Sequence, residues 1–250
     1  MLMRKLIGFI LTPIFYFCFF LCLIIFHPIQ WISLKIGGYK AHKISVDLLN
    51  CLLVACNYIL FNRTRFIDNK TLPTGRPIIF VANHQSTYDI PPLIFFLRRF
   101  HGKFISKIEL MNARIPSISL NLKYGGAANI DRKDPKQSIA EILNLANNMK
   151  NKNWSAFIFP EGTRTKTGKM KSFSIGGIAT LIKKNPEALI VPIAINGSYK
   201  MVQWGSFPLR PFTSMSWEVL EPLHTTGLTI EEIVFLAESV IKAKVIEENT

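Results

Sequence analysis

The chain has 250 residues, of which 30 are Lys or Arg and 16 are Asp or Glu, so its formal net charge is +14. This length fits one domain of moderate size with a sizeable core, plus an appendage. Hydrophobic residues make up 49% of the chain, which is high for a soluble protein. The basic residues form no dense run with interleaved aromatics, which argues against a nucleic-acid partner. The five histidines lack metal-ligand spacing, so no metal site is expected.

The first expected element is an apolar helix over residues 6–26, a stretch without a charged side chain. A helix of that length covers roughly 30 Å, enough to cross the hydrocarbon core of a bilayer. A secretory signal is the competing interpretation, because Arg4 and Lys5 precede the stretch. No small-residue cleavage site follows it, so we expect the segment to be retained.

A second apolar helix is expected over residues 44–61. Its polar residues Asp47, Asn50 and Asn57 form a narrow stripe, which suits a helix at the membrane interface or one docked on the domain. We therefore expect residues 1–61 to anchor the protein to one face of a membrane, either as a hairpin or embedded in one leaflet. Residues 62–250 would form a single domain.

The rest of the chain alternates between expected strands and helices. We expect strands at 76–82, 102–106, 126–130, 155–159, 189–195 and 214–220, and helices at 89–97, 135–150, 175–184 and 229–247. This alternation predicts an α/β fold, with a mixed sheet flanked by helices and preceded by the N-terminal membrane-associated helices.

A histidine and a carboxylate follow the first of these strands. His84 lies at the exit of the strand, and Asp89 lies near the start of the next helix. Ligands of open α/β sheets bind at the carboxyl ends of the strands, so the pair could be a catalytic base and its orienting carboxylate. In the alternative interpretation, Ser86 or Thr87 caps the helix and Asp89 favours its dipole, without a catalytic role for His84.

A second polar turn follows the strand at 155–159. Pro160 ends the strand, and Gly162 lets the backbone approach a ligand closely. The guanidinium of Arg164 suits a phosphate, because its planar fork can make two parallel hydrogen bonds to phosphate oxygens. Further basic residues follow at Lys166, Lys169 and Lys171, and a polar surface loop is the alternative interpretation.

Together, the two motifs resemble the glycerolipid acyltransferase family. Its Asn-His-x-x-x-x-Asp block matches residues 83–89, and its Phe-Pro-Glu-Gly-Thr-Arg block matches residues 159–164 without a mismatch. Weaker matches fall at 107–110, 126–132 and 191–195, so the resemblance covers roughly residues 76–196. One departure is Asn129, which stands where the family usually has a bulky apolar residue.

The resemblance implies roles for specific residues. His84 would be the general base and Asp89 its partner, while Lys107 and Arg164 would hold the phosphate of the acceptor. Glu161 and Gly162 would shape the glycerol site. The substrate-binding residues that the resemblance implies are Lys107, Arg132, Glu161, Gly162, Thr163 and Arg164.

The implied reaction moves an acyl group from acyl-CoA or acyl-carrier protein to the sn-2 hydroxyl of lysophosphatidic acid, giving phosphatidic acid. It needs no cofactor, and its location would be the cytoplasmic face of the inner membrane. Asn129 keeps a different lysophospholipid or a lyso-aminolipid open as the acceptor. Two other classes remain, a serine hydrolase using Ser86, which lacks the usual Gly-x-Ser-x-Gly turn, and a non-catalytic basic membrane or lipid-binding protein.

Overall fold

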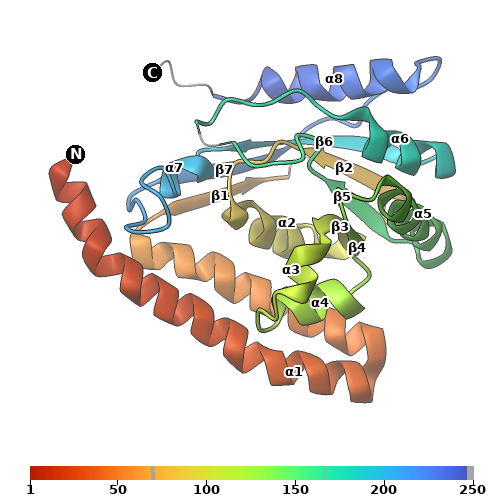
Figure 1. The fold of residues 1–250 in the computed structure, drawn as a ribbon. Coiled ribbons are helices and arrows are strands. Elements are labelled where there is room, and N and C mark those ends of the chain that lie inside the picture. Colours follow the sequence, from red (N-terminus) through yellow and green to blue (C-terminus); the bar gives the residue numbers. More distant parts are fainter. Residues whose placement is uncertain (69–70, 166, 247–250) are drawn as a thin grey trace.

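The computed structural model describes residues 1–68, 71–165 and 167–246. A seven-stranded sheet lies at its centre, with strands in the order β1-β7-β6-β2-β5-β3-β4. Helices cover both faces, as Figure 1 shows, with α8 on one side and the long helix α1 on the other. The expected α/β class with a mixed sheet is confirmed.

The strands pair in parallel at every position except one, between β6 and β7. Five strands therefore end at one edge of the sheet, and the loops that follow them meet there. The strands are β1 (Arg63–Ile67), β2 (Ile78–Ala82), β3 (Gly102–Lys107), β4 (Ala128–Ile130), β5 (Ser155–Ile158), β6 (Leu189–Asn196) and β7 (Ser214–Val219).

The helices form two layers. The α-helices are α1 (Leu2–Cys56), α2 (Ile90–Phe96), α3 (Ile108–Asn112), α4 (Ile118–Tyr124), α5 (Pro135–Lys152), α6 (Ile175–Lys184), α7 (Ser198–Met201) and α8 (Ile230–Lys242). Short 3₁₀ helices are η1 (Asn57–Leu60), η2 (Thr87–Asp89) and η3 (Arg98–Phe100). Helices α5, α6 and α8 pack on one face of the sheet, and α1 and α2 pack on the other.

The two faces of the sheet are apolar because β2 and β5 are buried throughout. Ile79 and Val81 point to the layer of α5, α6 and α8, while Ile78 and Phe80 point to the layer of α1 and α2. This alternation follows from the period of two along a strand. Strands that are buried on both faces form continuous apolar runs, which is why sequence patterns indicate them.

Helix α1 folds back on itself as a hairpin. Gly38 interrupts it with a φ of 60° and a ψ of −153°, so two arms run antiparallel beneath the sheet (Figure 1). Leu23 and Phe26 of the first arm pack against Leu49 and Leu53 of the second. By length and composition, this helical stretch is apolar enough to cross a membrane.

The polar stripe of the second arm faces the domain. Asp47 accepts a hydrogen bond from Lys43, and the side chains of Asn50 and Asn57 are buried. The opposite side of the arm exposes Ile44, Leu48 and Leu52. Because the hairpin also shares a hydrophobic cluster with the sheet, the proposed division at residues 61 and 62 stays a prediction.

The structure departs from the expected elements in several places. It adds a strand, β1, and three short helices, α3, α4 and α7, that the sequence patterns did not indicate. The helix expected at 89–97 begins at Ile90, because a 3₁₀ turn precedes it. The helix expected at 229–247 ends at Lys242, and residue 247 of that prediction lies outside the described residues.

Candidate active site

His84 and Asp89 form a close pair at the carboxyl edge of the sheet. Asp89 Oδ2 lies 2.9 Å from His84 Nδ1, and the side chain of Asp89 is fully buried while that of His84 is 15% exposed. A carboxylate can only accept, so Nδ1 carries the proton and Nε2 keeps its lone pair. The ring therefore has the tautomer that a general base requires.

Asp89 is held by donors on all sides. Its Oδ2 atom also accepts from the backbone N–H groups of Gln85 at 2.7 Å and Ser86 at 2.9 Å. Its Oδ1 atom accepts from the hydroxyls of Ser198 at 2.5 Å and Ser86 at 3.3 Å. These bonds leave the carboxylate one orientation, which is the one that meets the imidazole.

The helix cap that competed with the catalytic interpretation also exists. Ser86 is the N-cap of η2, where its side chain accepts from the backbone N–H of Tyr88 at 3.1 Å. The Asp89 carboxylate completes a capping box by accepting from the Ser86 backbone. Because the same carboxylate reaches His84, the cap and the pair are one structure. Ser86 Oγ is engaged by the cap, which disfavours it as a nucleophile.

Strand β6 fixes this turn from the other side. Asn83 donates to the carbonyl of Ile195 at 2.9 Å and accepts from its N–H at 2.7 Å. One turn further, the backbone N–H of Ser198 donates to Gln85 Oε1 at 3.1 Å. The sequence correctly predicted a strand at 189–195, which is β6. It gave no signal for Ser198, because that residue is 109 positions away from Asp89, its partner.

Glu161 ties the second polar turn to the first. One carboxylate oxygen accepts from the backbone N–H of His84 at 2.7 Å, and the other accepts from that of Lys171 at 2.8 Å. The backbone N–H of Thr165 in turn donates to the His84 carbonyl at 2.9 Å, which joins the two backbones directly. Burial raises the pKa of the Glu161 carboxyl, and the two N–H donors act in the opposite direction. Both oxygens of Glu161 are thus used within the protein.

An aromatic stack leads from the histidine into the core. The ring of Phe159 lies on the imidazole of His84 with centroids 4.1 Å apart and an interplanar angle of 13°. Phe104 follows at 5.9 Å from Phe159, and Phe157 lies 4.7 Å from Phe104. The stack covers one face of the imidazole and keeps it apolar, a contact that the sequence motifs do not specify.

The basic residues of the predicted site stand at the same edge. Lys107 ends β3, where it pairs in register with Ile130, the last residue of β4, so Arg132 lies in the turn just after that strand. Arg164 lies beside Thr165, whose N–H bonds to the His84 carbonyl. The side chains of Lys107, Arg132 and Arg164 are exposed and make no hydrogen bond or ion pair with another described residue. Three cations are therefore available to an anionic ligand.

Two other residues of the second polar turn, Thr163 and Gly162, have different surroundings. Thr163 Oγ1 accepts from Lys171 Nζ at 2.7 Å. Gly162 has a φ of 68°, and no atom lies within 4 Å of the position that a Cβ would take. A ligand can therefore approach the Gly162 backbone, and a side chain at this position would be strained. Lys166, which belongs to the same basic cluster, lies outside the described residues.

Asn129 is bonded inside the protein. Its Nδ2 atom donates to the carbonyl of Leu122 at 2.7 Å, and its Oδ1 atom accepts from Ser106 Oγ at 3.3 Å. It therefore links β4, β3 and α4, where an apolar residue would only pack. Asn129 also lines a cavity of about 300 Å³, together with Gln137 and Lys123.

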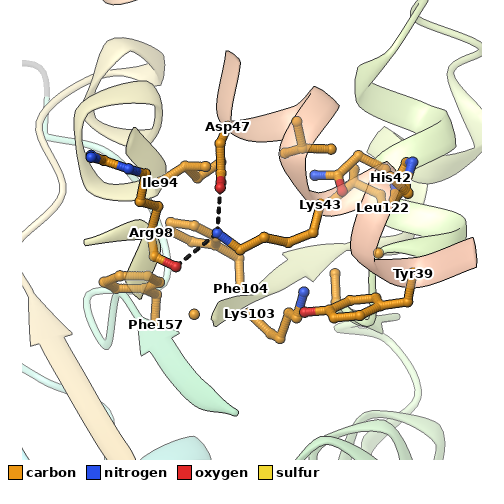
Figure 2. Close-up of a pocket in the computed structure, with 15 residues that line it drawn as sticks. Tyr39, His42, Lys43, Asp47, Ile94, Arg98, Lys103, Phe104, Leu122 and Phe157 are labelled. Carbon is orange, nitrogen blue, oxygen red and sulfur yellow. Dashed lines mark hydrogen bonds and ion pairs between the residues drawn. The ribbon is translucent and has the colours of Figure 1, made fainter. Parts of the chain in front are cut away.

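A smaller cavity lies below the sheet, between the second arm of α1, α2 and α4. Its volume is about 50 Å³, room for a few water molecules. Figure 2 shows Lys43 at its centre, donating to Asp47 Oδ2 at 2.5 Å and to the carbonyl of Arg98 at 2.7 Å. Phe104 and Phe157 form part of the wall, so the aromatic stack that begins at His84 ends here.

Lys103 also lines this cavity. Its side chain is buried, and its Nζ atom lies 4.7 Å from the ring centroid of Tyr39 and 4.5 Å from that of Trp154. Burial, together with the charge of Lys43, lowers the pKa of Lys103 to about 7. Its ammonium makes no hydrogen bond with a described residue.

Comparison with known proteins places the site in a wider group. A family model described as Acyltransferase matches residues 42–196, which include both motifs. The crystal structure of the 1-acyl-sn-glycerophosphate acyltransferase PlsC from Thermotoga maritima superimposes with a TM-score of 0.78 at 25% identity, covering 97% of this chain and 96% of that one.

Two relatives show how the similarity is distributed. The chloroplastic 1-acyl-sn-glycerol-3-phosphate acyltransferase LPAT1 of Arabidopsis thaliana is 32% identical over 62% of this chain and 42% of its own length. The 1-acyl-sn-glycerol-3-phosphate acyltransferase alpha of Mus musculus is 30% identical over 78% of this chain and 67% of its own length. The chain spans half or less of the length of two relatives: LPAT1, and the 1-acyl-sn-glycerol-3-phosphate acyltransferase CHLREDRAFT_174358 of Chlamydomonas reinhardtii.

Proposed function

Because the chain belongs to the acyltransferase family, we propose that it moves a fatty acyl group from a thioester to the sn-2 hydroxyl of lysophosphatidic acid. The product is phosphatidic acid. The observation that carries the proposal is the contact of His84 Nδ1 with the buried Asp89 carboxylate, beside three exposed cations. The names of the relatives at up to 32% identity, and of the PlsC structure, support this acceptor.

The proposed reaction runs in two proton steps. His84 Nε2 takes the proton of the acceptor hydroxyl as its oxygen attacks the thioester carbonyl. The carbonyl oxygen becomes an oxyanion, and Asp89 stabilises the imidazolium that has formed. When the oxyanion collapses, the carbon–sulfur bond breaks and the imidazolium returns its proton to the departing thiolate. The substrate alcohol occupies the place that a serine has in a triad, so no acyl-enzyme forms.

The acceptor is proposed to bind through its phosphate. Lys107 and Arg164 supply charge at the carboxyl edge, and Arg132 lies in the turn after the neighbouring strand β4. Arg164 can make two parallel bonds to phosphate oxygens. The open space beside Gly162 allows the glycerol to approach, and Thr163 belongs to the same turn. Glu161 acts on the acceptor indirectly, by holding the turn against His84.

The donor is proposed to be acyl-CoA or acyl-carrier protein, with no cofactor. The proposed location is the cytoplasmic face of the inner membrane, where the acceptor resides. The hairpin of α1 supports membrane association, because its outward side exposes large apolar residues along both arms, including Ile10, Phe17, Ile24, Ile44 and Leu48. A helix that exposes this much apolar surface is stabilised by lipid.

An acceptor panel tests the proposal. Purified full-length protein in detergent is given a radiolabelled or mass-tagged acyl-CoA with lysophosphatidic acid, other lysophospholipids or a lyso-aminolipid. We expect phosphatidic acid as the main product, and a loss of about 10²- to 10⁴-fold in kcat for His84→Ala, which removes the base. His224→Ala, at a position that is far from the motifs in sequence, serves as the matched control and retains its activity.

Two results would overturn the assignments. If His84→Ala turns over at a near-normal rate, His84 is not the base. If a different lyso-acceptor is used at higher kcat/KM than lysophosphatidic acid, the second candidate replaces the first. Asn129 is the observation that keeps this second candidate in view, because it puts an amide where the family usually has an apolar side chain.

A further inference from the structure

Three phenylalanines are exposed at the end of the sheet where the hairpin returns. We call Phe61, Phe207 and Phe212 the aromatic foot; their exposed fractions are 64%, 50% and 44%. Phe61 follows η1, and the other two belong to the loop that joins α7 to β7. Exposing this much aromatic surface to water is unfavourable in free energy, and exposed apolar patches of this kind mark interaction sites.

The backbone holds two of these rings outward under strain. Phe61 has a φ of 52° and Phe212 a φ of 55°, in the left-handed region that bulky residues avoid. Such a conformation costs roughly 1–2 kcal/mol per residue. The two rings stack on each other, with centroids 5.5 Å apart and an interplanar angle of 15°. Glycine or asparagine would relieve the strain at an ordinary surface turn, so the phenylalanines mark a contact site.

The loop of the foot is fixed to the hairpin. Leu209 N donates to Thr12 Oγ1 at 2.9 Å, and Phe212 N donates to the Leu60 carbonyl at 2.9 Å. At Gly8, a Cβ would lie 2.6 Å from the Leu209 carbonyl oxygen, so the first arm and the loop are in close contact. The foot is therefore rigid relative to α1 and is positioned before any partner arrives.

The foot continues the apolar surface of the hairpin. The ring of Phe207 meets that of Phe9 on the first arm, with centroids 5.4 Å apart. Figure 1 shows the same relation, with the loop after α7 beside the N-terminal arm and on the other side of the sheet from α8. The continuous surface thus runs from the outward side of α1 on to the catalytic domain.

The charges around the foot all have one sign. No Asp or Glu occurs in residues 1–46, 57–67 or 198–217, while these segments contain Arg4, Lys5, Arg63 and Arg210. Basic residues beside an aromatic surface suit an anionic leaflet, where each contributes about 1 kcal/mol. Aromatic rings favour the layer between head groups and acyl chains.

We propose that the aromatic foot is a second membrane contact, which inserts into the interfacial layer of an anionic bilayer beside the hairpin. The proposal rests on the membrane association proposed above and adds a contact made by the catalytic domain itself. If the hairpin were the single contact with the membrane, the protein could rotate about the long axis of the hairpin. A second rigid contact removes that freedom and sets the height of the carboxyl edge, where the acceptor must arrive from the bilayer.

Photo-crosslinking tests the contact without relying on turnover. The photoreactive analogue p-benzoyl-phenylalanine replaces Phe207, Phe212 or Phe235 in the full chain, in separate proteins. Phe235 is the matched control, because it is 72% exposed and lies on α8, across the sheet. Each protein is reconstituted into vesicles of phosphatidylethanolamine and phosphatidylglycerol, irradiated and analysed by mass spectrometry. We expect phospholipid adducts at 207 and 212 and at least roughly tenfold fewer at 235, since only the foot enters the lipid layer.

The other outcomes contradict the proposal. Crosslinks to a second copy of the chain would make the foot a protein interface. An absence of lipid adducts at 207 and 212, or equal yields at all three positions, would show that the foot does not enter the bilayer. A second measurement separates this result from the proposed function. Phe207→Ser with Phe212→Ser is expected to keep the activity in detergent micelles but lose several-fold in vesicles, with Phe235→Ser unchanged in both.

Discussion

The turn after β2 and the amino end of β3 hold buried charges in opposite ways. The Asp89 carboxylate accepts hydrogen bonds from five donors, including His84 Nδ1 and the Ser198 hydroxyl. The Lys103 ammonium is also buried, but it lies against two aromatic rings without a hydrogen bond to any described residue. A fully bonded charge has one orientation, which suits chemistry, whereas a charge without acceptors mainly lowers stability.

The largest expected effect is that of Asp89→Asn. The amide oxygen is expected to face the N–H groups of Gln85 and Ser86, since an NH₂ group there would meet two donors. It then still accepts from His84 Nδ1, so the tautomer is kept and only the negative charge is lost. We expect kcat to fall by about 10²- to 10⁴-fold. Steady-state kinetics measure the fall, and an unchanged thermal midpoint confirms the fold. Activity close to that of the unmodified protein would show that the charge has no catalytic role.

Arg164→Ala tests an exposed cation at the same edge. A charge-assisted bond contributes about 1.5–3 kcal/mol, so we expect the KM for the acceptor to rise roughly 10- to 100-fold. The thermal midpoint should stay constant, because the guanidinium bonds to no described residue. Lys169→Ala, in the following loop, provides the matched control. An unchanged acceptor KM would remove Arg164 from the phosphate site.

A smaller effect is expected for Ser198→Ala, which removes the 2.5 Å bond to Asp89 Oδ1. We expect kcat to fall about fivefold to tenfold, with KM unchanged, on the scale of one hydrogen bond to a charged group. A double-mutant cycle with Asp89→Asn tests whether Ser198 affects kcat through the Asp89 carboxylate. If Ser198 acts through the carboxylate, its substitution costs little more once Asp89 is changed; full additivity would contradict this.

Lys103→Met is expected to increase the stability of the protein and to leave its turnover unchanged, unlike the substitutions above. The pKa of Lys103 is about 7 in the folded protein, below its ordinary value of 10.5, so the unfolded chain binds more protons between these values. Stability therefore rises with pH across this window. We expect Lys103→Met to be more stable than the unmodified protein by about 1–4 kcal/mol below roughly pH 7. That advantage is lost as the pH approaches 10.5, the ordinary pKa of the side chain.

Thermal unfolding in detergent at several pH values checks this prediction. Lys43→Met is the matched control with the opposite sign, since it breaks a bonded ion pair with Asp47 in the same cavity. A Lys103→Met protein that is less stable in mildly acidic buffer would show that the rings of Tyr39 and Trp154 stabilise the charge by more than its burial costs.

The sequence predicted the parts of the fold that depend on local patterns. Strands β2 and β5 appeared as apolar runs because both faces are covered, and α5 was indicated by its proline and helical spacing. Strand β1 was missed because polar and apolar residues mix in Arg63–Ile67, which is half-buried at an edge. The helices α3 and α4 are too short to give a periodic signal.

The site, like the fold, was predicted where it depends on residues close together in the sequence and missed where it depends on distant ones. His84 and Asp89 are five positions apart, so a motif contains both. The bonds from Ser198 to Asp89 and from the His84 backbone to Glu161 join distant segments, and no local pattern reports them. The roles of Lys107, Arg132 and Arg164 stay predictions. The substitution of Arg164 tests the residue that precedes Thr165, whose N–H donates to the His84 carbonyl.

The pairing of β1 with β7 has a consequence for how the chain is made. Thr213 N donates to Asn62 Oδ1 across 151 positions, and the β1–β7 register begins beside this bond. On a ribosome, the hairpin would emerge long before Ser214, leaving β1 with an unpaired backbone throughout most of synthesis. Such long-range pairing slows folding and exposes strand edges to aggregation. The hairpin, which we propose as the membrane anchor, can therefore reach lipid before the sheet has closed.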